Sequence, residues 1–312
     1  MQKLILTNHQ SPGDIVMMTA AVRDLHAHYP GRFLTDVRTP CPALWQHNPH
    51  LSPLADDDGE AESLRCEYPL IHRSNAEPWH FLHGFGQDLA VRLGLPHVRP
   101  TAWRGDLHLG EEERGWIGQV AEITGEDAPY WIVVSGGKLD YTAKWWCAGR
   151  LQQVIDALPD RRWVQVGEAH HRHPPLRGVL DLRGRTDLRQ LVRLVYHSVG
   201  VVCPVTLLMH LAAAVPMRPD RGRRSRPCVV IAGGREPPHW EAYPTHQYLH
   251  RVGTLACCDT GGCWKARVWP LGDGTASDAS LCLDPVATSG LPRCLHEITV
   301  DDVVRAVRVY DA

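Results

Sequence analysis

The chain has 312 residues, of which 22% are charged and 44% hydrophobic, the proportions of an ordinary folded protein. This length suits two domains and excludes a disordered chain or a fibrous repeat. The formal net charge of −2 argues against nucleic acid as a partner held by the charge of the whole chain, although it leaves room for a local basic patch.

The first part of the chain alternates between short apolar runs and apolar residues at helical spacing. Leu4–Leu6 is typical of a buried parallel strand, and Ile15–His28 predicts a helix that ends at Tyr29-Pro30-Gly31. The next predicted elements are a strand at Phe33–Val37, a short helix at Cys41–His47, a strand at Tyr68–His72, and helices at Trp79–Leu93 and Glu111–Ile123. Strands that alternate with helices predict βαβ units and a doubly wound parallel sheet.

The same alternation restarts near residue 130. The predicted strands are Tyr130–Val134, Trp163–Val166, Val179–Leu182, Val199–Cys203 and Cys228–Ala232, the last of the series. The predicted helices are Leu151–Leu158, Thr186–His197, Leu207–Ala214 and Ile298–Val309. We therefore predict an α/β fold with two Rossmann-like domains, residues 1–127 and 128–297, and a C-terminal helix within 298–312. Such domains face each other across a cleft, and ligands bind at the carboxyl ends of their strands.

The loop Ser11-Pro12-Gly13-Asp14 joins the first predicted strand to the first predicted helix. Gly13 lets another molecule approach the backbone, and a helix N-terminus favours an anion. Spacing alone leaves two readings of Asp14 open, a helix cap and a catalytic carboxylate. The loop lacks the second and third glycines of a dinucleotide fingerprint, so a nicotinamide cofactor is not expected.

Half of the 10 cysteines fall in a stretch with little periodicity, residues 250–295. They are Cys257, Cys258, Cys263, Cys282 and Cys294. Neither a secretory signal nor a membrane span is evident, so we expect a cytoplasmic, reducing compartment, where clustered cysteines are metal ligands before disulfides. Four thiolates form a closed tetrahedral site for zinc or iron, which predicts a structural ion and leaves one of the adjacent Cys257 and Cys258 spare. Five unconnected reduced cysteines are the alternative.

Three groups of residues, taken in order, resemble a known family. The first is residues 11–23, Ser-x-Gly-Asp-Ile-Val-Met-Met-Thr-Ala-Ala-Val-Arg, followed by Tyr29-Pro30 and residues 47–50, His-Asn-Pro-His. The second is Lys144-Trp145-Trp146 with residues 181–186, Asp-Leu-Arg-Gly-Arg-Thr, and the third is residues 206–214, Thr-Leu-Leu-Met-His-Leu-Ala-Ala-Ala. Together they resemble the family 9 glycosyltransferases, the heptosyltransferases.

This resemblance implies a GT-B fold and transfer with inversion, without a metal ion in the active site. The first domain would bind an acceptor hydroxyl and the second a nucleotide diphospho-sugar donor, with ADP-heptose favoured. Asp14 would be the general base. The residues implied in donor binding are Gly13, Gly136, Lys144, Thr206, Leu207, Met209 and His210. Val205 and Leu207 replace an aspartate and a glycine of the family's motif, which puts the donor's identity in doubt. A solvated Lys144 and a core histidine at position 210 are the alternatives.

A narrower resemblance lies in residues 233–240, in 244–250 and around Cys257-Cys258 and Cys263-Trp264. These stretches are similar to the autotransporter heptosyltransferases, which carry a cysteine-bound iron ion and modify serine hydroxyls of proteins. The resemblance places Arg235 and Glu236 on the donor side, while a rigid turn that orders the metal loop is the alternative. The acceptor stays open between a glycan, a protein and a modified nucleobase, and a homo-oligomer is compatible with the sequence. The alternative function is a non-catalytic, metal-stabilised protein that binds nucleotide sugars.

Overall fold

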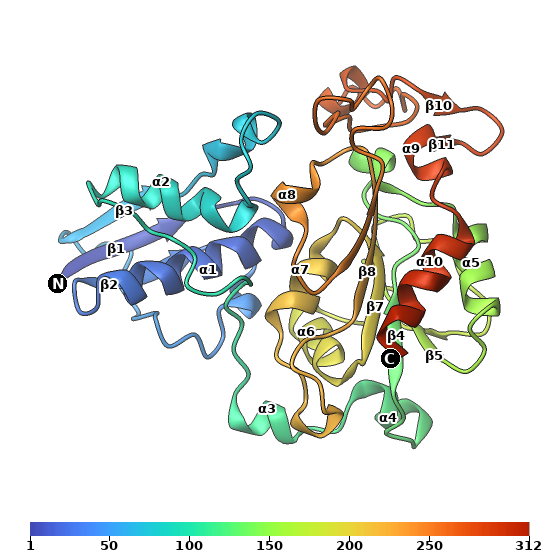
Figure 1. The fold of residues 1–312 in the computed structure, drawn as a ribbon. Helices are drawn as coiled ribbons and strands as arrows, with labels where there is room; N and C mark the ends of the chain where they lie inside the picture. Colours follow the sequence, from blue (N-terminus) through green and yellow to red (C-terminus); the bar gives the residue numbers. More distant parts are fainter. Residues whose placement is uncertain (312) are drawn as a thin grey trace. The chain divides into compact units, whose positions relative to one another are not determined.

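The computed structural model describes residues 1–311 and divides into two compact units (Figure 1). The first unit is residues 1–116 with 213–216, and the second unit is the rest of the described chain. Ala312, the last residue of the C-terminal segment 298–312, lies outside the described residues. No helix within residues 1–311 is long and apolar enough to cross a membrane.

The first unit is built on a three-stranded parallel sheet in the order β2-β1-β3. Its strands are β1 (Gln2–Thr7), β2 (Phe33–Arg38) and β3 (Ala61–Arg65). β1 lies in the middle because Leu4, Ile5 and Leu6 are all buried, as a strand covered on both faces requires. The helices α1 (Pro12–His28) and α2 (Gly84–Arg92) pack against each other. The predicted strands at Leu4–Leu6 and Phe33–Val37 and the helix from Ile15 are confirmed.

One prediction for the first unit is wrong, and one strand was not predicted. The predicted strand Tyr68–His72 is instead a 3₁₀ helix, η2 (Pro69–Arg73), because the fixed φ of Pro69 suits the first position of a helical turn. The third strand is β3, a polar and mostly exposed edge strand that no apolar pattern marks.

Other predicted helices are shorter or broken. The predicted helix Glu111–Ile123 is divided into α3 (Glu111–Gly115) and α4 (Gln119–Thr124), with a glycine at the end of the first and before the second. The structure also has the short 3₁₀ helices η1 (Pro42–Leu44) and η3 (Phe81–His83), which replace much of the predicted helix Cys41–His47 and the start of Trp79–Leu93.

The second unit holds six parallel strands in the order β6-β5-β4-β7-β8-β9. They are β4 (Tyr130–Val133), β5 (Arg162–Gln165), β6 (Leu180–Asp181), β7 (Gly200–Pro204), β8 (Cys228–Gly233) and β9 (Gln247–His250). This is the order of a doubly wound Rossmann sheet, in which the direction of strand addition reverses between β4 and β7. The predicted strands are confirmed, except that β8 is not the last. β9 follows it as a half-buried edge strand.

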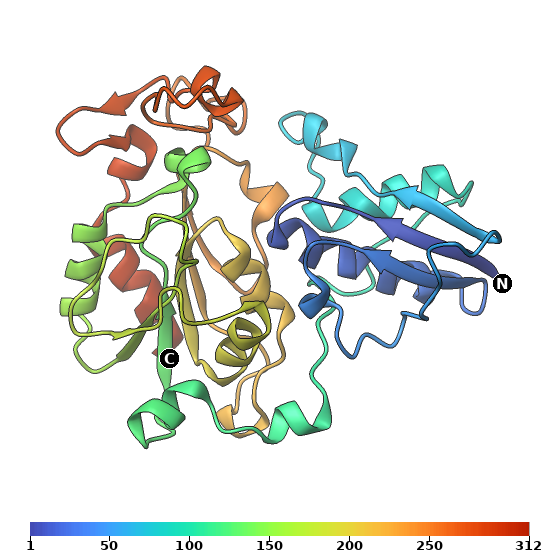
Figure 2. The ribbon, with the colours of Figure 1, turned by 180° about the vertical axis from the view of Figure 1, so that it is seen from behind.

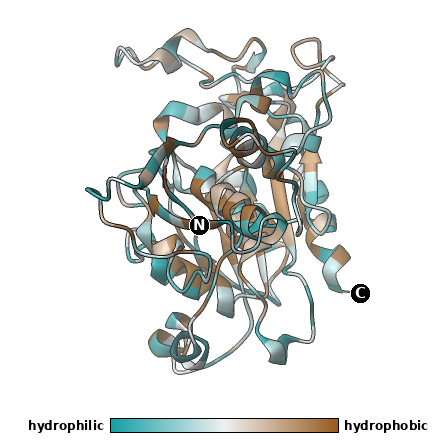
Figure 3. Ribbon diagram, turned by 90° about the vertical axis from the view of Figure 1, so that its left-hand side faces the viewer, coloured by the Kyte–Doolittle hydropathy of each residue, from teal (hydrophilic) through white to brown (hydrophobic). Residues whose placement is uncertain are grey.

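Helices follow or flank the strands of this second sheet. They are α5 (Ala148–Asp156), α6 (Leu188–His197), α7 (Leu207–Ala214), α8 (Pro238–Glu241), α9 (Arg293–His296) and α10 (Val300–Arg308). A buried cluster joins α5 and α10 to the strands, with Trp131, Trp163 and Val303 among its members. The brown colouring in Figure 3 shows apolar residues gathered along strands and inner helix faces.

Residues 251–297, which we name the cysteine-rich loop, connect β9 to the capping region of α10. The loop holds η6 (Ala276–Ala279) and a small antiparallel pair, β10 (Pro285–Val286) and β11 (Leu291–Pro292). Its two ends lie together, because the Arg251 guanidinium donates to the Glu297 carbonyl oxygen at 2.9 Å. In Figures 1 and 2 the loop (orange) lies next to the green segment that contains the 3₁₀ helix η4 (Leu139–Lys144).

Candidate functional site

The predicted donor-binding residues of the second unit follow the carboxyl ends of three strands. Gly136 comes after β4, Thr206 after β7, and Arg235 and Glu236 after β8. In doubly wound sheets this edge binds ligands, at the point where the strand order reverses. Here that point lies between β4 and β7. The topology therefore gathers residues from three separate motifs at one edge of the sheet.

Lys144, Arg235 and Glu236 form a charged cluster at this edge. The buried Glu236 carboxylate accepts a hydrogen bond from Lys144 Nζ at 2.7 Å and another from the Arg235 guanidinium, both at Oε1. Burial opposes the ionisation of Glu236, but the charges and hydrogen bonds of Arg235 and Lys144 keep its pKa below the ordinary value. Two cations around one carboxylate leave a net positive charge, which suits a phosphate ligand.

Aromatic rings hold the two cations of this cluster. The Tyr141 ring centroid lies 5.5 Å from Lys144 Nζ and 5.2 Å from the Arg235 guanidinium, and the Trp264 ring lies 5.4 Å from Arg235. Cations over ring faces gain electrostatic attraction without losing charge. The Lys144 side chain is still 22% exposed, and Tyr141 is 40% exposed. The cluster is therefore accessible to a ligand.

His210 on α7 belongs to a closed cluster instead. Its Nδ1 lies 2.8 Å from the Tyr243 hydroxyl, and its Nε2 lies 3.7 Å from a Glu241 oxygen. All three residues are buried. These contacts favour the core-histidine reading of His210.

The first turn of α7 offers backbone groups rather than side chains. The Thr206 hydroxyl oxygen accepts from the Leu208 N–H at 3.3 Å, and the Met209 side chain is fully buried. Leu207 is half-buried. Donor binding at Thr206, Leu207 and Met209 therefore remains a prediction that rests on the backbone N–H groups of this turn.

Gly136 allows the backbone around Arg172 to pack closely against the loop after β4. A Cβ at this position would lie 1.9 Å from the Arg172 carbonyl oxygen. The next residue, Gly137, exchanges two backbone hydrogen bonds of 3.1 Å with Arg172. The absence of a side chain at Gly136 is therefore needed for local packing, whether or not a donor also binds there.

In the first unit, Asp14 is held by a tyrosine. It lies in the first turn of α1, whose N-cap is Ser11, so Asp14 is not the N-cap residue. Its Oδ1 accepts a hydrogen bond from the Tyr68 hydroxyl at 2.7 Å. The Tyr68 ring packs against Phe81 and Phe85, with centroids 4.7 and 5.0 Å away. Sequence reasoning missed Tyr68 because it assigned that residue to a strand.

Gly13 occupies the turn before Asp14, between Pro12 and the carboxylate. This position gives the start of α1 little side-chain bulk. Its predicted contact with the donor stays a prediction.

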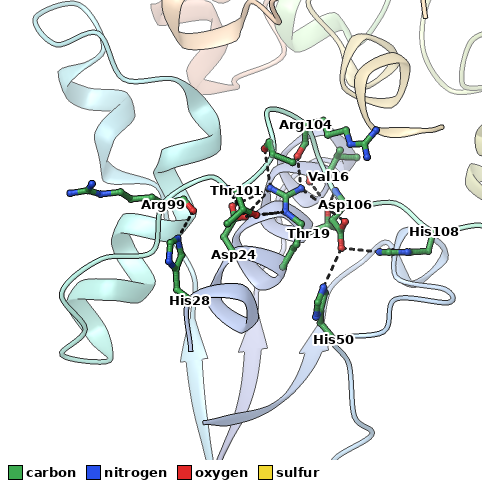
Figure 4. Close-up of polar contacts among 12 residues, drawn as sticks. Val16, Thr19, Asp24, His28, His50, Arg99, Thr101, Arg104, Asp106 and His108 are labelled. Carbon is green, nitrogen blue, oxygen red and sulfur yellow. Dashed lines mark hydrogen bonds and ion pairs between the residues drawn. The ribbon is translucent and has the colours of Figure 1, made fainter. Parts of the chain in front are cut away.

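A second polar group of the first unit fastens the chain around residues 99–108 to α1 (Figure 4). The Thr101 backbone N–H and hydroxyl donate to the buried Asp24 carboxylate at 3.0 and 2.6 Å. Asp106 lies between His108 and His50, at 2.8 and 3.8 Å, and its N–H donates to the Thr19 hydroxyl oxygen. Because these groups satisfy one another, they explain how this segment is positioned.

The clustered cysteines lie around one small cavity. Cys257, Cys263, Cys282 and Cys294 line a cavity of about 10 Å³, and Cys258 is buried close by. Burial, with the neighbouring thiols as a lesser cause, raises the pKa of Cys257 to about 11 and that of Cys294 to about 12. A cation would remove this cost, since metal-bound thiols are deprotonated. Within residues 1–311, however, no group of three or more His, Cys, Asp or Glu side chains is arranged to hold a metal ion.

No protein-family model and no curated protein matches the chain, but solved structures do. A family 9 glycosyltransferase from Veillonella parvula matches with a TM-score of 0.60 and 13% identity, over 80% of this chain and 85% of that one. The ADP-heptose lipopolysaccharide heptosyltransferase II of E. coli matches with a TM-score of 0.56 and 16% identity, over 99% and 98%. The chain has the fold of these glycosyltransferases.

A third match with this heptosyltransferase fold is TibC, a dodecameric, iron-containing heptosyltransferase solved in complex with ADP-D-β-D-heptose. Its TM-score is 0.63 at 15% identity, over 99% of this chain and 76% of that one. The parallel α/β architecture predicted from the sequence is thus confirmed.

Proposed function

We propose that the protein is an inverting glycosyltransferase that takes a sugar, with heptose favoured, from an ADP-linked donor. The observation that carries the proposal is the cluster of Lys144, Arg235 and Glu236 at the ligand-binding edge of the second sheet. The heptosyltransferase fold supports it, since two of the matched structures are named for ADP-heptose. The acceptor is a hydroxyl group on a glycan or a protein.

In this proposal Asp14 is the general base. A hydroxyl is a poor nucleophile, and a positioned carboxylate assists by accepting its proton as the new glycosidic bond forms. The bond between the anomeric carbon and the diphosphate breaks in the same displacement, which inverts the anomeric centre. Lys144 and Arg235 stabilise the negative charge that gathers on the leaving ADP.

The test measures binding and transfer separately. We expect ADP to bind in calorimetry, and we expect ADP-heptose to be consumed only when a glycan or a serine-containing protein acceptor is supplied. Asp14→Asn should abolish transfer and leave ADP binding within about twofold, because the base acts on the acceptor. Unchanged turnover in Asp14→Asn would overturn the role of Asp14. ADP binding without transfer to any acceptor would instead favour a non-catalytic binding protein.

We also propose that four of the five clustered thiols hold one iron or zinc ion. The shared cavity, the burial of Cys258 and Cys294 and the iron in TibC support this. A closed four-sulfur site is structural, because it leaves no position for a substrate. Metal analysis of protein never exposed to chelator should give about one ion per chain. Cys282→Ser should lose the ion, and Cys147→Ser, outside the cluster, should keep it. A wild-type content far below one ion per chain contradicts the site.

A further inference from the structure

The cysteine-rich loop is hydrogen-bonded to both segments that carry the candidate donor site. On one side, the Cys263 and Trp264 N–H groups donate to the carbonyl oxygens of Gly234 and Arg235 at 3.1 and 3.0 Å. The Arg235 Nε returns a bond to the Lys265 carbonyl oxygen at 2.7 Å. The loop thus runs directly beside the chain that presents Arg235 and Glu236.

The same stretch of the loop is bonded on its other side to η4, which ends at Lys144. The Ala143 N–H donates to the Ala266 carbonyl oxygen at 3.0 Å. The Val268 N–H donates to the Thr142 hydroxyl oxygen, also at 3.0 Å. Residues 263–268 therefore connect the chain before Lys144 to the chain before Glu236.

Arg267, in the middle of this stretch, is fully buried and contacts three carboxylates. It makes a bidentate pair with Asp273 at 2.8 and 2.7 Å, and it also pairs with Asp278 and, at 3.2 Å, with Asp140. Its Nε donates to the Leu139 carbonyl oxygen at 3.1 Å. A planar guanidinium satisfies several acceptors in fixed directions, which a lysine cannot do.

These partners belong to different parts of the second unit. Asp273 and Asp278 fold the outer part of the cysteine-rich loop, whereas Leu139 and Asp140 begin η4. The Arg267 carbonyl oxygen also accepts from the Cys282 N–H at 2.7 Å. One side chain and its own backbone therefore fix the loop, one clustered cysteine and the segment that carries Lys144.

From these contacts we infer that Arg267 is a positioning residue for donor binding. Its guanidinium holds η4 against the cysteine-rich loop and so keeps Lys144 and Arg235 together at Glu236. The inference rests on the proposed function, because it requires that the cluster of Lys144, Arg235 and Glu236 binds the donor. It does not require the metal ion, since every contact involved is made by the chain itself.

The experiment compares Arg267→Met with Arg161→Met. Arg161 is a matched control: it is mostly buried in the same unit and pairs with Asp311, but it lies just before β5, at the opposite end of the sheet. We expect Arg267→Met to weaken ADP binding in calorimetry by about tenfold or more and to raise the donor KM more than it lowers kcat. Arg161→Met should lower the unfolding temperature without changing ADP binding. Arg267→Lys should recover only part of the affinity.

A second variant keeps the test valid if Arg267→Met does not fold. Asp140→Asn removes one carboxylate that is 51% exposed and with it the ion pair between Arg267 and η4, while the bond from Arg267 to the Leu139 carbonyl oxygen stays. We expect it to weaken ADP binding by about threefold with an unchanged unfolding temperature. Folded variants at Arg267 or Asp140 that bind ADP as tightly as wild type overturn the inference and leave the proposed function intact. A wild-type chain that binds no ADP overturns both.

Discussion

The second unit contains two polar clusters, each of which joins a buried glutamate to a basic side chain and a tyrosine, in opposite surroundings. In the open cluster, Glu236 binds two cations that rest on an exposed tyrosine, and one of these cations reaches solvent. In the closed cluster, Glu241 and the Tyr243 hydroxyl surround His210 in the interior. Sequence motifs marked a member of both for donor binding. The difference shows that a residue within a functional motif can serve to stabilise the fold. Only residues that are exposed to solvent are available to bind a ligand.

The largest effect should come from the open cluster. Lys144→Gln keeps a hydrogen-bond donor for Glu236 but removes a positive charge next to the leaving diphosphate. We expect kcat/KM to fall by about 10²–10³-fold with little change in stability, as for the loss of a preorganised group that stabilises transition-state charge. Steady-state kinetics and thermal unfolding measure the two effects. A kcat/KM within about twofold of wild type would remove Lys144 from the site.

The closed cluster should respond in the opposite way. His210→Phe deprives Tyr243 and Glu241 of a buried partner, so we expect a loss of about 1–3 kcal/mol in the free energy of unfolding. ADP binding should stay within about threefold. Urea unfolding and calorimetry separate these readouts, and Tyr243→Phe, which removes only one hydroxyl, should cost less. If His210→Phe loses ADP binding while its stability is unchanged, His210 belongs with the open cluster.

A buried histidine beside the closed cluster should reduce the stability of the protein in acid. His246 packs against Tyr243, with ring centroids 5.0 Å apart, and burial lowers its pKa to about 3. The folded state therefore keeps His246 neutral, whereas the unfolded chain binds a proton near pH 6.5. The free energy of unfolding therefore has its full value above about pH 6.5. As the pH is lowered from 6 to 4, protonation of His246 in the unfolded chain reduces it by about 1.4 kcal/mol per pH unit.

His246→Leu tests the acid effect directly. Its free energy of unfolding should depend less steeply on pH than that of wild type across this range. Lys144→Gln, in the open cluster, should keep the wild-type slope. Equal slopes in His246→Leu and wild type would show that another group controls acid unfolding. The first to test are His173 and His197, whose pKa values burial lowers to about 4.

The smallest effect should come from Tyr68 in the first unit. Its substitution tests whether the hydrogen bond to Asp14 serves catalysis, like the open cluster, or stability, like the closed cluster. Tyr68→Phe removes only the hydroxyl that donates to Asp14 and keeps the ring against Phe81 and Phe85. We expect kcat to fall about fivefold, because the carboxylate loses one orienting hydrogen bond, and ADP binding to stay unchanged. A lower unfolding temperature with a normal kcat would assign the bond to stability alone.

The sequence predicted the buried strands of the fold better than the exposed ones. The strands β4, β7 and β8 follow from continuous apolar runs, because strands covered on both faces admit little else. The edge strands β3 and β9 were missed, since half-exposed strands carry polar residues that resemble loops.

The candidate site was predictable as residues but not as contacts. Motifs in three separate loops indicated Lys144, Thr206 and Arg235, and the topology then brought those loops to one edge. That Glu236 pairs with both cations, and that Tyr68 reaches Asp14, depends on side-chain directions set by distant packing. Local patterns carry no information about such directions.

The joined ends of the cysteine-rich loop have a consequence for how this fold can vary. Arg251 ties the entry of the loop to its exit at Glu297, so the chain leaves β9 and returns toward α10 at nearly the same place. The exposed outer part of the loop can therefore change in length without moving the two ends that hold β9 and α10. A new binding property can thus be added within the outer loop while the core of the second unit stays the same.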